Sequence, residues 1–364
     1  MSALTARPGI MDISPYVGGE SKIPGVDRVI KLASNEGAFG PSPKAQEAYR
    51  QAAGQLHRYP DSSGPELRAA LARHFGVNSA NIVFGAGSDE LLGLLCRAYA
   101  GPGDEVLYPA HGFLMYPIAA KTAGATPVTA PETNLTADVD NLLAKVTDRT
   151  RIVFLANPNN PTGSYISKDE LQRLRDGLPK GVLLVIDAAY AEFMTQNDYA
   201  PGIELVEAGE NVVMTRTFSK IFALGSLRLG WAYAPASICD VLNRVRNPFN
   251  VSQSALVAGL AALEDTAFTD KSRDHNAKWL AWTTEEVRKL GLTVPPSHGN
   301  FILVRFPERD GKTAEAADAY LKSRGIIVRR MVPYGLGDSL RVSIGLGDEM
   351  EAFAAALADF MAAA

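Results

Sequence analysis

Four polar runs in this sequence have residue types that could do chemistry, and each directly follows a segment of apolar and β-branched residues. The runs lie at 85–90, 157–163, 187–190 and 217–220. Segments of that composition are typical of strands buried on both faces of a parallel sheet. Because such sheets present reactive residues at the carboxyl ends of their strands, we expect these runs to meet at one edge of a sheet.

Pyridoxal-phosphate (PLP) chemistry would use the residue types that these runs contain. It needs a lysine amine, for which Lys220 is the candidate. It needs a carboxylate such as Asp187 beside the pyridine nitrogen, because an anion there keeps the ring protonated and able to accept electrons. The dianionic phosphate needs helix-start N–H groups, hydroxyls and an arginine, which the 85–90 run and Arg228 would supply. The sequence therefore predicts PLP as cofactor.

Several motifs follow one another in a fixed order between residues 32 and 345. Thr-Phe-Ser-Lys stands at 217–220, Leu-Arg-Leu-Gly at 227–230 and Asn-Asn-Pro-Thr-Gly at 159–163. Others are Leu-Ala-Ser-Asn-Glu at 32–36, Arg-Tyr-Pro-Asp at 58–61, Gly-Ser-Asp-Glu at 87–90 and Leu-Arg-Val-Ser-Ile-Gly at 340–345. Together they resemble the motifs of fold-type-I PLP aminotransferases, and within that family those of the histidinol-phosphate aminotransferases.

The resemblance implies a role for each matching position. The expected catalytic residues are Lys220, as the Schiff-base lysine, Asp187, as the partner of the pyridinium nitrogen, and Tyr190. With Asn160, Tyr190 would also bond the phenolate oxygen of the cofactor. The further cofactor-binding residues would be Ser88, Asp89, Phe113 (stacked on the ring), Thr217, Ser219 and Arg228. Arg341, with Arg329 as a second candidate and Asn35 in a nearby loop, would bind the substrate.

The same resemblance implies a homodimer with shared active sites. Tyr59 would reach the phosphate of the cofactor bound in the other subunit. The implied reaction is amino transfer between L-histidinol phosphate and 2-oxoglutarate, giving imidazole-acetol phosphate and L-glutamate in histidine biosynthesis.

One departure from the subfamily pattern leaves the amino donor open. The subfamily usually reads Asn-Glu-Asn-Pro where this chain has Asn-Glu-Gly-Ala at 35–38. Aromatic amino acids (phenylalanine or tyrosine) are therefore an alternative donor, and a threonine-phosphate decarboxylase is a more distant alternative. A transcription regulator with an aminotransferase-like module would place a basic DNA-binding domain before residue 34, and only about 30 residues precede that point.

The pattern of elements predicts an α/β fold with two unequal parts. Helical and strand-like segments alternate from about 65 to 235, which indicates a mostly parallel seven-stranded sheet sandwiched by helices. The expected strands are 82–84, 105–108, 126–129, 152–156, 182–187, 212–217 and 230–234. We expect an N-terminal arm at 1–30 packed with the smaller domain, a large PLP-binding domain at 31–245, and a small α+β C-terminal domain at 246–364 with strands near 301–306, 326–329 and 340–343.

Composition restricts the remaining classes of function. The 364 residues include 36 Lys and Arg against 40 Asp and Glu, a net charge of −4, which offers no basic surface for nucleic acid. No apolar run is long enough for a membrane helix, and the first residues do not resemble a secretion signal. The five histidines show no metal-ligand spacing. Two distant cysteines fit a reducing compartment, so the sequence predicts a cytoplasmic enzyme without a metal site.

Overall fold

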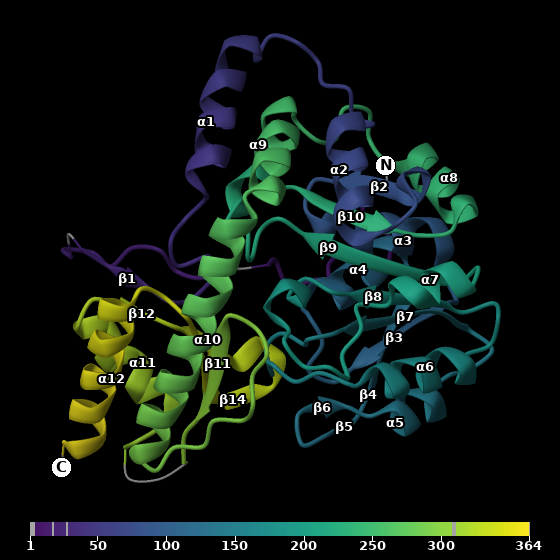
Figure 1. The fold of residues 1–364 in the computed structure, drawn as a ribbon. Coiled ribbons are helices and arrows are strands. Elements are labelled where there is room, and N and C mark those ends of the chain that lie inside the picture. The colour runs from purple at the N-terminus through teal and green to yellow at the C-terminus, as the bar shows by residue number, and fades with distance from the viewer. Residues whose placement is uncertain (1–3, 17, 27, 308–310, 364) are drawn as a thin grey trace.

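A seven-stranded sheet forms the centre of the larger part of the molecule (Figure 1). The structure is a computed structural model that describes residues 4–16, 18–26, 28–307 and 311–363. In spatial order the strands are β2 (Ile82–Gly85), β10 (Gly230–Tyr233), β9 (Val212–Thr217), β8 (Leu183–Asp187), β7 (Thr150–Ala156), β3 (Glu105–Pro109) and β4 (Thr126–Ala130). Strand β10 runs antiparallel to both of its neighbours, β2 and β9, and the other adjacent pairs in this sheet are parallel. The predicted α/β fold and its mostly parallel sheet are confirmed.

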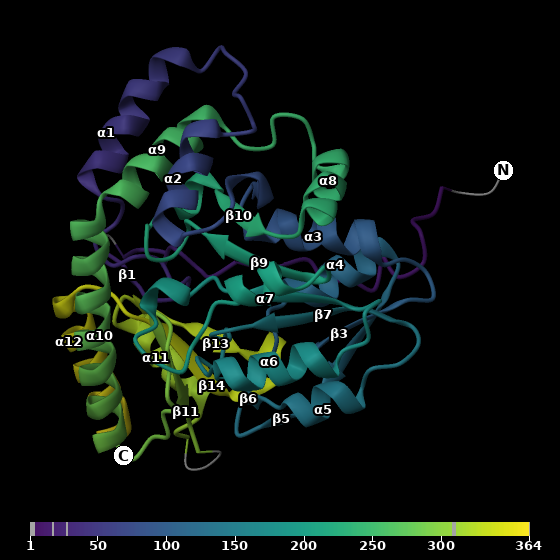
Figure 2. The same cartoon turned by 45° about the vertical axis from the view of Figure 1, so that its right-hand side comes forward.

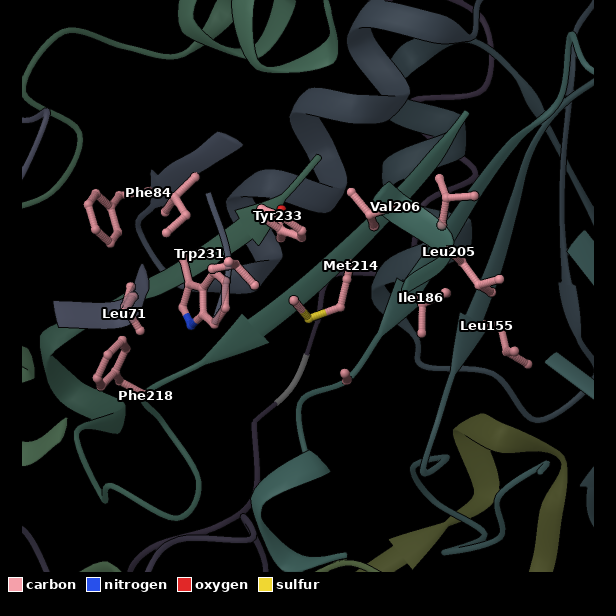
Figure 3. Packing of buried hydrophobic residues seen from close by; sticks show 14 of the residues in the cluster. Leu71, Phe84, Leu155, Ile186, Leu205, Val206, Met214, Phe218, Trp231 and Tyr233 are labelled. Carbon is pink, nitrogen blue, oxygen red and sulfur yellow. The ribbon is translucent and has the colours of Figure 1, made fainter. Parts of the chain in front are cut away.

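Helices cover both faces of this sheet, which explains why several of its strands are nearly continuous apolar runs. One face packs against α3 (Ser88–Tyr99), α4 (Met115–Ala123) and α8 (Ala236–Val245). The other packs against α2 (Pro65–Phe75), α5 (Val139–Ala144), α6 (Lys168–Gly177), α7 (Ile203–Ala208) and α9 (Gln253–Glu264). On this second face Phe84, Trp231, Met214, Ile186 and Leu155 follow one another across five adjacent strands (Figure 3).

The C-terminal part has its own sheet and its own apolar core. Strands β11 (Phe301–Arg305), β14 (Leu336–Ser343) and β13 (Arg329–Met331) pair antiparallel in that order. Helices α10 (Thr266–Lys289), α11 (Ala314–Ser323) and α12 (Gly347–Ala362) pack beside them. The single strand expected near 326–329 is divided: β12 (Ile326–Ile327) pairs with β1 (Ile30–Lys31), and β13 pairs with β14. Local apolar pattern cannot reveal that division, because it is set by the partners on each side.

The N-terminal segment contacts both parts of the molecule. Near its start the segment passes beside α4 (Figure 2). There Arg7 donates to the Thr122 carbonyl at 2.7 Å, and Lys121 of α4 donates to the Asp12 carbonyl. Further along, Glu20 pairs with Lys322 of α11 at 2.9 Å. Beyond it, α1 (Pro43–Ala52) lies along α9. The domain limits drawn after residues 30 and 245 stay a prediction.

The remaining elements are short. Strands β5 (Glu132–Thr133) and β6 (Thr136–Ala137) form a two-stranded hairpin after β4.

Among the described residues, no helix combines the length and the apolar composition that crossing a membrane requires. The same residues contain no group of three or more His, Cys, Asp or Glu side chains arranged to hold a metal ion.

Candidate active site

A cavity of about 300 Å³ lies where the polar runs meet, between the large sheet and the C-terminal part. Every side chain that the sequence assigned to the site, apart from Tyr59, lines it. They are Asn35, Ser88, Asp89, Phe113, Asn160, Asp187, Tyr190, Thr217, Ser219, Lys220, Arg228, Arg329 and Arg341. Residues from many separate segments of the chain therefore converge on one volume. Those that follow β7, β8 and β9 meet there because the carboxyl ends of parallel strands lie at one edge of the sheet.

Lys220 is placed in this cavity by β9, which ends three residues before it. Its Nζ lies 3.4 Å from the Ser34 carbonyl oxygen and 5.8 Å from the centre of the Tyr190 ring. Burial, and secondarily the positive charge of Arg341, lower the pKa of Lys220 to about 8. A substantial fraction of this amine is therefore neutral, and so nucleophilic, near neutral pH.

Asp187 is the last residue of β8, and its carboxylate is buried. Its Oδ2 accepts a hydrogen bond from the Tyr116 hydroxyl at 3.0 Å, and the Thr215 hydroxyl lies 3.5 Å from Oδ1. Burial raises the pKa of Asp187 to about 6, against the opposing effect of the Tyr116 bond. A buried carboxylate without a cationic partner is costly, and a cationic ring nitrogen in the cavity would relieve that cost.

Tyr116 and Thr215 are site residues that sequence reasoning missed. Tyr116 is fully buried and stacks on Phe154, with ring centres 4.7 Å apart. The one indication of it in the sequence is that Tyr116 follows Phe113 by three residues and so lies close to a position already assigned to the site. Thr215 faces Asp187 because the two residues are register partners in adjacent strands. That pairing can be known only after the strand order is known.

The start of α3 forms a site suited to an anion. Gly87 caps the helix with a φ of +79° and offers no side-chain cap, so the first N–H groups of the helix lack such a partner. Arg228 completes the site by donating to Ser219 Oγ at 3.3 Å and to Asp89 Oδ2 at 3.0 Å. A Cβ on Gly87 would lie 2.2 Å from the Arg228 guanidinium, so only glycine permits this approach.

A second polar cluster joins the C-terminal part to the sheet. Arg341 Nη1 donates to Asn160 Oδ1, and Nη2 donates to the Ala33 carbonyl at 2.8 Å. Its Nε is buried and has no hydrogen-bond partner among the described residues, which leaves a donor available to a ligand. Asn35 Nδ2 donates to the Tyr190 hydroxyl at 2.9 Å, and burial raises the pKa of Tyr190 to about 12.

The N-terminal segment closes part of the cavity, which the sequence did not indicate. Tyr16, Gly18 and Gly19 line it, and Arg329 Nη1 donates to the Gly18 carbonyl at 2.7 Å. A segment rich in Pro and Gly has no hydrophobic period from which its packing can be predicted. Arg330, the neighbour of Arg329, instead pairs with Glu315 at 2.9 Å.

Tyr59 is the one assigned residue that lies outside the cavity. Its side chain is 82% exposed and its ring stacks on Phe249, with ring centres 4.5 Å apart. Phe249, Leu56 and Tyr49 are also exposed. Within a single chain, therefore, Tyr59 does not line the cavity that the other assigned residues form.

The fold is that of an aminotransferase. A family model described as aminotransferase class I and II matches residues 27–357, and the chain belongs to this family.

More particular similarity is to proteins named histidinol-phosphate aminotransferase. The one from Paramagnetospirillum magneticum is 65% identical over 363 residues, covering all of both chains. The one from Rhodospirillum centenum is 59% identical over 361 residues, covering 99% of each. The crystal structure of the Sinorhizobium meliloti enzyme in complex with pyridoxal-5'-phosphate is 32% identical, with a TM-score of 0.89, and covers 99% of this chain and 98% of that one.

Proposed function

We propose that this chain is a PLP-dependent aminotransferase that moves an amino group between L-histidinol phosphate and 2-oxoglutarate in histidine biosynthesis. The observation that carries the proposal is the convergence of Lys220, Asp187 and the anion site around Arg228 on one cavity. The full-length identity of 65% to a histidinol-phosphate aminotransferase supports the choice of substrate. The products would be imidazole-acetol phosphate and L-glutamate.

The residues of the cavity fit PLP. The start of α3, which Gly87 caps and which has Ser88, Asp89, Thr217, Ser219 and Arg228 around it, has the donors that a dianionic phosphate needs. At the other end the buried Asp187 carboxylate has no cationic partner among the residues that the structure describes, and it would pair with the ring nitrogen. Asn160 and Tyr190 would bond the phenolate oxygen, and Phe113 would stack on the ring. When bound, the cofactor supplies a ring that withdraws electrons from the Cα of the substrate.

Each catalytic side chain then has a defined task. Lys220 Nζ takes the proton from Cα of the amino donor and later returns one, a role that its pKa of about 8 suits. Asp187 holds the proton on the ring nitrogen, so that negative charge developing at Cα is stabilised. The hydrogen bond from Tyr116 keeps the carboxylate oriented.

Arg341 would bind the anionic end of both substrates. A guanidinium group can donate a pair of hydrogen bonds to a phosphate or to a carboxylate with similar geometry. One arginine can therefore bind both substrates of the reaction in turn. Arg329 and Asn35 lie beside it, Arg329 at the N-terminal segment and Asn35 on Tyr190. Their assignment as substrate-binding residues is part of the proposal.

The choice of substrate is tested by a single half-reaction without a keto acid. PLP-loaded protein should lose its yellow absorption band rapidly with L-histidinol phosphate and much more slowly with L-phenylalanine, L-tyrosine or L-threonine phosphate. A preference for the aromatic amino acids would move the function to aromatic transamination. Release of CO₂ from threonine phosphate would identify a decarboxylase.

We propose further that two copies of the chain form a homodimer with shared active sites. The support is Tyr59, which is exposed together with Phe249 and Leu56 and lies outside its own cavity. A Tyr59→Phe variant should bind PLP at least about tenfold more weakly, because it loses a hydrogen bond to a charged phosphate.

A mixed dimer separates an action across the interface from one within the chain. Tyr59→Phe chains are co-expressed with Lys220→Ala chains, and activity is assayed at a PLP concentration that saturates only the wild type. A heterodimer regains one site with both native residues, so random pairing should restore about a quarter of wild-type activity. No recovery in the mixture would rule out the exchange of Tyr59 between subunits.

The cysteines support a cytoplasmic location for this enzyme. Cys96 and Cys239 are both free and buried. Burial raises the pKa of Cys96 to about 12 and that of Cys239 to about 11. Thiols held in this form are unreactive core residues, as expected in a reducing compartment.

A further inference from the structure

Glu132, on the β5–β6 hairpin, lies outside the cavity, and its carboxylate makes two polar contacts with a single residue, His111. Its Oε1 accepts the backbone N–H of His111 at 3.0 Å, and its Oε2 lies 2.8 Å from Nδ1 of the same histidine. The Glu132 side chain is only 2% exposed, so water cannot replace these bonds. None of the steps assigned above uses this buried carboxylate.

His111 lies in the loop that places Phe113 in the cavity. The loop joins the end of β3 at Pro109 to the start of α4 at Met115. Gly112 donates to the Pro109 carbonyl at 2.8 Å, and a Cβ at Gly112 would lie 3.0 Å from that oxygen, so the turn is closely packed. A displacement of His111 would therefore be transmitted to Phe113 two residues later.

The loop also holds the segment on the other side of the cavity. Asn159 Nδ2 donates to the His111 carbonyl at 3.2 Å and to Thr162 Oγ1 at 2.9 Å. Its neighbour, Asn160, lines the cavity and accepts a bond from Arg341. One buried carboxylate thus fixes a residue that touches both the Phe113 loop and the Asn160 segment.

We infer that Glu132 is a positioning residue that acts through His111 to hold Phe113 and Asn160 in place for the cofactor. The inference rests on the proposed function, because that proposal assigns Phe113 and Asn160 to PLP. With the loop already fixed, the protein would not have to order it when PLP binds, which favours binding. Loss of the carboxylate should weaken binding of PLP even where the fold is retained.

The test is the dissociation constant of PLP, together with the visible circular dichroism of the bound cofactor. Glu132→Ala should bind PLP about tenfold more weakly and give a smaller dichroic signal, because two bonds to a buried charge are lost. Glu132→Gln keeps an acceptor for the backbone N–H and should stay within about threefold of the wild type. His111→Ala keeps the backbone bond and should fall between the two.

Glu105→Ala is the matched control. Glu105 begins the same strand that leads to His111, is also nearly buried, and bonds Thr147 and Arg149. Its loss should lower stability and leave PLP binding unchanged. If Glu132→Ala does not fold, His111→Ala, with the same control, decides the question.

A double-mutant cycle separates positioning from general destabilisation. In a Phe113→Ala background, Glu132→Ala should weaken PLP binding by a smaller factor than it does in the wild type, because one of the two residues that it positions is gone. Equal effects in both backgrounds, unchanged PLP binding by Glu132→Ala, or an equal effect of Glu105→Ala would each overturn the inference. Failure of the wild type to bind PLP would instead contradict the proposed function.

Discussion

Replacing Lys220 by alanine should slow amino transfer by about 10⁴-fold or more, because it removes the amine that the proposal assigns to move the Cα proton. Arg341 also lines the cavity, but a guanidinium group has no acceptor atom and cannot replace the lysine amine as a base. The phosphate and ring contacts do not involve the lysine amine, so Lys220→Ala should still bind PLP, without a covalent bond. Half-reaction rates and the absorption spectrum of the bound cofactor measure both effects.

Lys220→Arg is the control for charge, since it keeps a cation in place but offers no neutral amine. It should be as inactive as the alanine variant. A Lys220→Ala enzyme that retains more than about one hundredth of wild-type activity would contradict the assignment.

The pH dependence of PLP capture provides a second check on Lys220. Its pKa is lowered from 10.5 to about 8 in the folded protein, so the neutral amine becomes abundant as the pH rises through 8. The rate at which the empty protein captures PLP should therefore rise between about pH 7 and pH 9. The same shift means that the folded state binds fewer protons than the unfolded state between pH 8 and 10.5, so this group adds stability as the pH rises there.

The sequence was most informative about the reactive residues that directly follow buried strands. Strands β7, β8 and β9 are buried on both faces, so each contains a run of apolar residues, and the polar residues that follow these strands are conspicuous. Asp187 and Lys220 could be found for that reason. The motifs that carry the family resemblance then supplied roles that composition alone does not give.

Other parts of the site depend on contacts that no local pattern records. Thr215 reaches Asp187 only through strand register, and Tyr116 through the packing of α4 on the sheet. Tyr16 and Gly18 reach the cavity from a segment without regular structure. The division between β12 and β13 arises because the two strands pair with different sheets.

Asp187→Asn should lower the rate of amino transfer but raise the stability of the PLP-free protein. The buried carboxylate has its pKa raised to about 6 from 3.8, so the folded state binds more protons than the unfolded state between these values. The free energy of unfolding therefore falls as the pH rises from about 4 to 6. Above that range the buried charge of Asp187 lowers it by the full amount, about 3 kcal/mol. Asparagine has no charge to bury and still accepts the Tyr116 hydroxyl, so the PLP-free variant should be more stable than wild type at pH 7.5 and nearly equal near pH 4.

Amino transfer should nevertheless fall by about 10³-fold or more, because an uncharged amide cannot hold the proton on the ring nitrogen. Denaturant unfolding at the two pH values and half-reaction rates measure the two effects. Tyr116→Phe is the control: it removes the hydrogen bond but keeps the charge, so it should lose far less activity and gain no stability at pH 7.5. An Asp187→Asn protein that is less stable than wild type at pH 7.5 without PLP would contradict the burial argument. Since a cationic ring nitrogen relieves the cost only in the wild type, adding PLP should stabilise the wild type by more than it stabilises the variant.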